Sequence, residues 1–153
     1  MRQLEWEARF DGAFCWGNSF GYFDHDNCLR FLAAVARSLK PGGRFLLESG
    51  AVAETLIPIF QEESAVKLGD IDFRSQRAYD AAEGRMDITY TFIQGERTEV
   101  KSIHQWVHTA AEIGRMFRRG GLEPVAAYGS SQGEPFRLGS SRLVREGRRY
   151  TGG

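Results

Sequence analysis

The residues best suited to chemistry lie at positions 15 to 22, in the run Cys15-Trp16-Gly17-Asn18-Ser19-Phe20-Gly21-Tyr22. The amide and hydroxyl groups in this run can hydrogen-bond a small polar ligand. Tyr22 can also hydrogen-bond a substrate or act on an amine proton. The alternative is that Gly17 and Asn18 only supply turn geometry, while Phe20 and Phe23 belong to the core.

Two strands and one helix are predicted to position this run. Residues 10–16 are mostly apolar without alternation, which is typical of a parallel strand buried on both faces. An amphipathic helix follows, with Asp24 or Asp26 as its N-cap and Pro41-Gly42-Gly43 at its end. Phe45-Leu46-Leu47 is a second short apolar strand.

The order strand, helix, strand predicts a βαβ unit with parallel strands and a right-handed crossover. In open α/β sheets, ligands bind beyond the carboxyl ends of the strands. Residues 15–22 and 48–50 therefore lie at the predicted functional edge.

The middle of the chain has a different pattern, in which apolar and polar residues alternate. Met86, Ile88, Tyr90 and Phe92 are separated by polar residues, as in strands with one buried face. Glycine-containing turns separate three extended runs, 72–80, 85–94 and 98–107. The pattern predicts an antiparallel meander inserted over residues 70–107 of a single domain that covers residues 1–153.

The last third of the chain returns to helix and strand. Thr109 and Glu112 form a capping-box pattern at the start of a helix that ends at Gly120-Gly121. A strand is predicted over 122–128, then a loop, then a bent strand over 136–149.

Composition limits the function classes. Lysine plus arginine equals aspartate plus glutamate, 20 each, so the net charge is zero and gives no electrostatic case for nucleic acid. No apolar run is long enough to span a membrane, and no signal peptide is recognisable, so we expect a cytoplasmic protein with no membrane partner. Cys15 and Cys28 are predicted to be free thiols.

Two further groups of side chains are candidates for a site. His25, His104 and His108 lack the accompanying ligands that a metal site needs, so no metal is predicted. Arg74, Arg77 and Tyr90 in the meander can bind a carboxylate substrate, although a solvated strand face is the simpler interpretation.

The run FDGAFCWGNSFGYF…LRFLAAVARSLKPGGRFLLES resembles the fourth strand, the following helix and the fifth strand of class I S-adenosylmethionine-dependent methyltransferases. LKPGG before an apolar strand is frequent in that family, and GNSFGY is similar to a segment of small-molecule N-methyltransferases of the glycine N-methyltransferase kind. TAAEIGRMFRRGGLEPVAAYGS and FRLGSSRLVREGRR resemble the helix with the sixth strand and the reversed seventh strand.

The resemblance implies a fold, a cofactor and a set of site residues. The fold is α/β, a partial Rossmann-like sheet in the order fourth, fifth, seventh, sixth, with an antiparallel insertion over the substrate pocket. The cofactor is S-adenosylmethionine. By resemblance, Tyr22 is the candidate catalytic residue, and the other site residues form two sets. The cofactor set is Met1, Arg2, Cys15, Trp16, Gly17 and Asn18, and the substrate set is Ser19, Phe20 and Tyr22.

The sequence lacks the family's GxGxG loop and the acidic residue of its second strand. We therefore expect the C-terminal portion of a methyltransferase domain, truncated before those motifs. One hypothesis is an enzyme acting on a small molecule at nitrogen or oxygen. The alternative is a non-catalytic binding or oligomerisation module. In either case the exposed edge strand 10–16 is predicted to support a homodimer.

Overall fold

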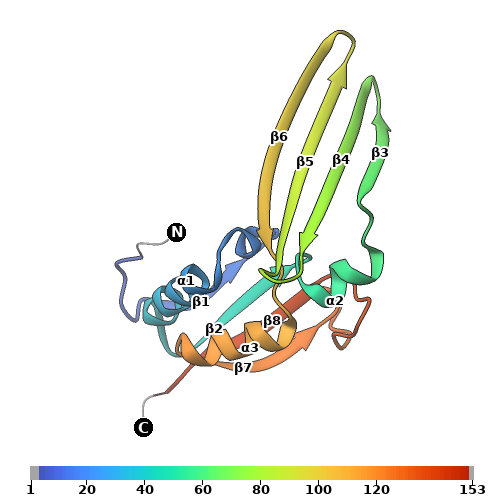
Figure 1. Ribbon diagram of the computed structural model, residues 1–153. Coiled ribbons are helices and arrows are strands. Elements are labelled where there is room, and N and C mark those ends of the chain that lie inside the picture. The colour runs from blue at the N-terminus through green and yellow to red at the C-terminus, as the bar shows by residue number, and fades with distance from the viewer. Residues whose placement is uncertain (1–3, 152–153) are drawn as a thin grey trace.

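The computed structural model describes residues 4–151, which form two four-stranded sheets (Figure 1). The body sheet has the order β1-β2-β8-β7, from β1 (Phe10–Cys15), β2 (Leu39–Ser49), β8 (Leu143–Arg149) and β7 (Leu122–Tyr128). β1 and β2 are parallel, and β8 runs antiparallel to both of its neighbours. The α/β fold class and the predicted strand order are confirmed.

Helices α1 (His25–Ser38) and α3 (Ala110–Arg119) pack on one face of the body sheet (Figure 1). Each helix begins at a side-chain cap. Asp24 accepts a hydrogen bond from the Asn27 backbone N–H at 2.8 Å, and Thr109 forms a capping box with Glu112. No helix among residues 4–151 is long and apolar enough to cross a membrane.

The core lies between these helices and the body sheet. A row of phenylalanine rings crosses it, with neighbouring centroids 5.7 to 6.2 Å apart: Phe20, Phe31, Phe45 and Phe117. All four side chains are buried. Buried aromatic rings remove large apolar areas from water, so this row stabilises the attachment of both helices to the sheet.

The opposite face of the body sheet is open, which corrects the prediction that the first strand is buried on both faces. Phe14 is 76% exposed, and its neighbour in register, Leu46, is 36% exposed. Both described helices that pack on this sheet lie on the other face, so neither helix covers these two side chains.

Some element ends also differ from the prediction. α1 ends at Ser38 and β2 begins at once, because a proline disfavours the helical conformation of the residue before it, here Lys40. The final strand forms only over β8, since residues 136–142 belong to a loop containing Gly139 at φ 85°.

The second sheet projects from the body and is called the arm here, residues 63–106 (Figure 1). It is an antiparallel meander of β3 (Glu63–Leu68), β4 (Ile71–Asp80), β5 (Arg85–Gln94) and β6 (Arg97–Trp106). The sequence predicted three of these strands. It gave no signal for β3 because most β3 side chains are exposed, so backbone pairing rather than apolar alternation defines that strand.

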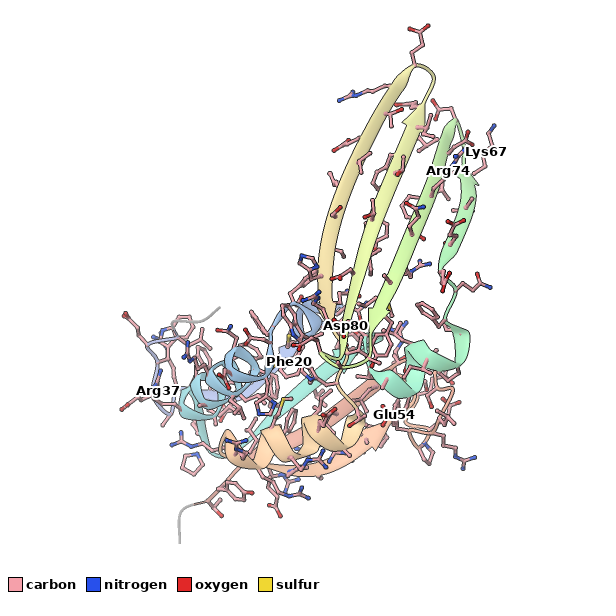
Figure 2. The ribbon with its side chains drawn as sticks, viewed as in Figure 1. Phe20, Arg37, Glu54, Lys67, Arg74 and Asp80 are labelled. Atoms are coloured by element: carbon pink, nitrogen blue, oxygen red, sulfur yellow. The ribbon has the colours of Figure 1, made fainter. Side chains whose placement is uncertain are left out.

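A short connection joins the arm to the body. α2 (Ala53–Leu56) and the 3-10 helix η2 (Ile57–Ile59) lead from β2 into β3. The Glu54 carboxylate (labelled in Figure 2) accepts the Ala110 backbone N–H at 3.1 Å, which ties α2 to the start of α3. A small core of Met86, Ile88 and Val107 then packs against Ala53 and Leu56 at the base of the arm.

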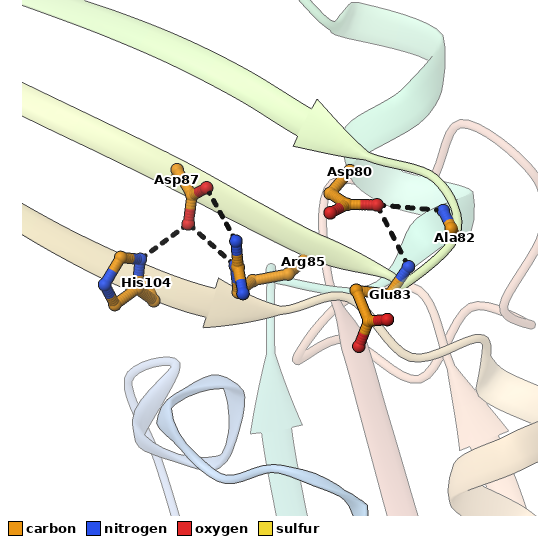
Figure 3. Close-up of polar contacts among 6 residues, drawn as sticks. All are labelled: Asp80, Ala82, Glu83, Arg85, Asp87 and His104. Atoms are coloured by element: carbon orange, nitrogen blue, oxygen red, sulfur yellow. Dashed lines mark hydrogen bonds and ion pairs between the residues drawn. The ribbon is translucent and has the colours of Figure 1, made fainter.

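Polar groups stabilise the outer face of the arm near its base (Figure 3). Asp87 on β5 accepts two hydrogen bonds from Arg85, at 2.9 and 3.1 Å, and contacts His104 on β6. The bonds from Arg85, then from His104, lower the pKa of Asp87 below its usual value. In the adjoining turn, the Asp80 carboxylate accepts the N–H groups of Ala82 and Glu83.

His108 is buried where the arm returns to the body, and this placement makes stability depend on pH. Its Nε2 lies 3.4 Å from the Phe23 carbonyl oxygen and 3.7 Å from the Cys28 sulfur. Burial lowers the pKa of His108 below its ordinary value, an effect that the Phe23 carbonyl and Glu112 partly oppose. Burial also raises the pKa of Cys28 to about 12, so the thiol stays protonated.

We predict that the free energy of unfolding falls as the pH is lowered through about 6.5 toward the folded pKa of His108, because the unfolded chain binds the extra proton. Carboxylates titrate below about 4.5, outside this window. Urea midpoints between about pH 7.5 and 5.5 should drop for the wild-type chain and stay flat for His108→Gln. The exposed-imidazole control His25→Gln should keep most of the wild-type slope, because His25 makes only a minor contribution to the lowered pKa of His108. A slope that survives in His108→Gln would contradict the assignment.

Candidate functional site

The loop after β1 turns sharply at the edge of the body sheet. Gly17 and Asn18 both adopt left-handed backbone conformations, with φ of 79° and 64°. Glycine and asparagine are the residues that tolerate this region, so the sequence favours the turn at this point.

Hydrogen bonds join this loop to the carboxyl end of β2. The Gly17 N–H donates to Oε2 of Glu48 at 2.7 Å, and the Asn18 side-chain oxygen accepts the Gly50 N–H. The ends of the two parallel strands, which the βαβ pattern placed at one edge, are therefore held together directly.

Glu48 has a further partner on a third segment. Its other oxygen, Oε1, pairs with Arg142 Nη1 at 3.3 Å, just before β8. The Glu48 side chain is only 6% exposed, whereas that of Arg142 is 44% exposed. A buried carboxylate needs such partners for both oxygens, so Glu48 fixes the positions of the three segments.

A cavity of about 360 Å³ lies between this edge and the arm and is called the arm cavity. Its apolar lining is Leu56, Ile59, Phe60, Met86 and Ile88. Its polar lining is Asn18, Gln61, Ser64, Arg77, Tyr90 and Gln105. Small-molecule sites combine an apolar wall with polar groups that fix the orientation of the ligand, and the arm cavity has both kinds of lining. Asn18 is the point where the loop after β1 reaches it.

A larger cavity of about 630 Å³ lies on another side of the arm base. Its lining includes Asp24 and Glu112, whose carboxylates already cap α1 and α3. These groups have structural roles, so the arm cavity is the better candidate.

The predicted site residues have different environments. Asn18 lines the arm cavity, and Trp16, two positions earlier, is 45% exposed. Cys15 is buried, and its pKa is raised by burial and then by Glu48, so it is a protonated thiol. Met1 and Arg2 lie outside the described residues.

The residues predicted to contact substrate are also divided. The Ser19 hydroxyl donates to the Trp16 carbonyl at 3.3 Å. Phe20 is only 1% exposed and packs against Phe31, so it supports the loop from within the core. Tyr22 is 51% exposed and lines neither of the two cavities.

The structure brings together two of the three arm residues that are candidates for carboxylate binding. Arg77 and Tyr90 both line the arm cavity, whereas Arg74 projects from the opposite face of β4, farther along the arm (Figure 2). Successive residues of a strand point to opposite faces, so Arg74 and Arg77, three positions apart, lie on different faces. The sequence alone could have predicted this separation. Gln61 and Gln105 gave no such signal, because a lone glutamine in a polar stretch is common.

The three histidines do not gather at one place, although His25 and His108 both line the larger cavity. His104 contacts Asp87 on the outer face of the arm, and His108 is buried in the body. Within residues 4–151, no three His, Cys, Asp or Glu side chains are close enough to hold a metal ion.

Comparison with known proteins identifies the fold. No protein-family model matches the sequence, and no curated protein matches it. Solved structures do match. A S-adenosylmethionine-dependent methyltransferase from Clostridium acetobutylicum superposes with a TM-score of 0.84 at 14% identity, over 97% of this chain and 62% of that one.

Two further structures agree. The CcbJ methyltransferase from Streptomyces caelestis gives a TM-score of 0.82 at 16% identity, over 92% of this chain and 61% of that one. CalS10, an amino pentose methyltransferase from Micromonospora echinaspora solved with S-adenosylmethionine bound, gives 0.69 at 17% identity, over 97% and 61%.

The chain therefore has the fold of the S-adenosylmethionine-dependent methyltransferases, as its sequence resemblance implied. It spans about 61 to 62% of the length of these structures.

We predict that Glu48→Gln lowers the free energy of unfolding by about 1–3 kcal/mol, because a buried hydrogen-bonded carboxylate loses its charge beside Gly17 and Arg142. Arg142→Gln should cost a similar amount, about 1–3 kcal/mol, because it leaves the buried Glu48 carboxylate without its charged partner. Urea unfolding followed by circular dichroism measures both variants. Glu123→Gln, an exposed site on β7, is the matched control, and equal stability of Glu48→Gln and the wild type would refute the role given to Glu48.

Proposed function

We propose that this chain forms the substrate-side portion of a cytoplasmic S-adenosylmethionine-dependent methyltransferase that acts on a small molecule at nitrogen or oxygen. The observation that carries the proposal is that the arm cavity is lined by Asn18, at the strand edge where ligands of α/β sheets bind. The fold shared with CalS10, described as an amino pentose methyltransferase, supports a small-molecule acceptor.

The residues of the loop after β1 fit one end of the cofactor. Gly17 has open space where a side chain would be, with nothing within 4 Å of an added Cβ, so a ligand can approach its backbone. The Asn18 side-chain oxygen is engaged by Gly50, which leaves its amide N–H groups for a ligand. Cys15, at the end of β1, and Trp16, at the start of the loop, are assigned to the same part of the cofactor, and Met1 with Arg2 are assigned to the adenine side.

Bound S-adenosylmethionine would supply an activated methyl group. The protein then has to hold the acceptor in line with it and exclude water, which requires positioning more than a dedicated catalytic group. In the proposed site the apolar wall of the arm cavity excludes water. By resemblance alone, Ser19 and Tyr22 are assigned to the acceptor side and Tyr22 to an amine proton; neither residue lines the arm cavity.

A specific observation favours the second function, a binding or oligomerisation module. Among the described residues β1 pairs only with β2, so its outer edge has free backbone groups. Phe14 adds an exposed apolar side chain to that edge. Edges of this kind are templates for pairing with another chain.

The first test is calorimetric titration of the 153-residue chain with S-adenosylhomocysteine. We expect a dissociation constant on the order of micromolar. Asn18→Gly should weaken it about tenfold, because the left-handed backbone is kept while the amide is lost. Asn27→Ala on α1 is the control and should bind like the wild type. No heat with millimolar ligand from a folded sample would favour the binding module over the enzyme.

The second test concerns the homodimer. Light scattering after size-exclusion chromatography should give the dimer mass, and Phe14→Glu should shift the sample to monomer by placing a charge on the edge. Circular dichroism confirms that the variant is folded. A wild-type chain that remains monomeric at high concentration would count against pairing through β1.

A further inference from the structure

The charge inside the arm cavity is carried by one side chain. Of the residues that line the cavity, only Arg77 is charged, and no acidic side chain is among them. Arg77 is half-buried, in a wall that also contains the buried side chains of Met86 and Ile88. The guanidinium group therefore gives this cavity a positive charge beside apolar side chains.

The contacts of Arg77 leave most of its donors available. Its Nη1 donates to the Ser64 hydroxyl at 3.3 Å, and that hydroxyl bonds to Ser75 at 2.7 Å. Among residues 4–151, no carboxylate lies within the 4.0 Å ion-pair distance of Arg77. Glu62 and Glu63 share a neighbouring hollow of about 310 Å³ with Arg77 without reaching it. A guanidinium has five N–H donors, so several remain for a ligand.

The backbone fixes where this charge stands. The Arg77 N–H donates to the Glu62 carbonyl at 2.7 Å, and Arg77 lies opposite Ile88 in the β4–β5 register. Shifting the register by one residue would turn Arg77 to the outer face, so its position depends on the pairing of the whole strand. The Ser64 contact further limits the rotamers of the side chain.

We infer that the arm cavity selects a small organic carboxylate, with Arg77 as the specificity-determining residue that binds its anionic end. The guanidinium can bind a carboxylate through two parallel hydrogen bonds, a geometry that lysine lacks. This inference rests on the proposed function for one point, namely that the bound carboxylate is the methyl acceptor.

The rest of the cavity matches such a ligand. Ile59 is 71% exposed, and it stands with Phe60 on the apolar part of the lining. An apolar or aromatic ligand body can cover both side chains. Since Asn18 and Arg77 line the same cavity, an acceptor bound by its carboxylate at Arg77 can extend toward the loop after β1. Arg77 then acts by orientation as well as by affinity.

The experiment compares phenylacetate with phenylacetamide, which has nearly the same shape and no charge. Binding of each to the full chain is measured by ligand-observed NMR titration. The wild type should prefer phenylacetate by about tenfold or more, because a charge-assisted pair in an apolar setting is stronger than a neutral bond. Arg77→Gln should remove the preference, and Arg77→Lys should restore part of it.

Arg74→Gln is the matched control. It removes one arginine from β4, as Arg77→Gln does, but from the opposite face of the strand. The two variants therefore have the same net charge and the same strand composition. It should keep the wild-type preference. Equal binding of the two compounds to the wild type, no binding of either at about 10 mM, or equal loss in Arg74→Gln and Arg77→Gln would each overturn the inference.

Titration with S-adenosylhomocysteine separates this inference from the proposed function. A carboxylate preference lost in Arg77→Gln, without cofactor binding, would leave the anion site standing and remove the methyltransferase proposal. Cofactor binding without a carboxylate preference would remove the anion site alone.

Discussion

The Glu48 carboxylate is the interaction on which the candidate site depends. It accepts the Gly17 N–H with one oxygen and pairs with Arg142 through the other, so the loop after β1, the end of β2 and the segment before β8 converge on one buried group. These segments are far apart in sequence, and this one carboxylate links all three of them. A charged group that is desolvated and fully partnered is costly to break on one side, and the geometry around it is therefore well defined.

The arm extends this defined edge into a cavity. Its inner face carries Met86, Ile88 and Tyr90, and its outer face carries polar groups such as Asp87 with its arginine and histidine partners (Figure 3). The apolar face attaches the arm to α2 and Val107, while the polar face stays in water. The same alternation that makes the sheet stable also turns Arg77 inward and Arg74 outward, so the chemistry of the cavity follows from strand periodicity.

The elements with strong local signals could be predicted from the sequence. Three of these signals depend only on residues close together in sequence. They are the caps at Asp24 and Thr109, the strict alternation in β5, and the βαβ order that sets the sheet edge. What could not be predicted depends on tertiary contacts. β3 has no apolar pattern because backbone pairing forms it, and the exposure of Phe14 depends on which face the helices occupy.

For the site, the loop after β1 was predicted, but Glu48 as its anchor was not. A glutamate after an apolar strand has the same local pattern whether it faces solvent or a buried N–H.

The order of strands in the body sheet has a consequence for folding. β8 lies between β2 and β7, so β2 gains its second neighbour only when residues 143–149 return across nearly a hundred positions of chain. The arm differs, since each of its strands pairs with the next one along the chain through a short turn. Loop closure is entropically cheap for the arm and expensive for the body. The meander should therefore form early, as a local unit, while β2 still presents an unpaired edge. The chain is most exposed to mispairing in the interval before β8 inserts.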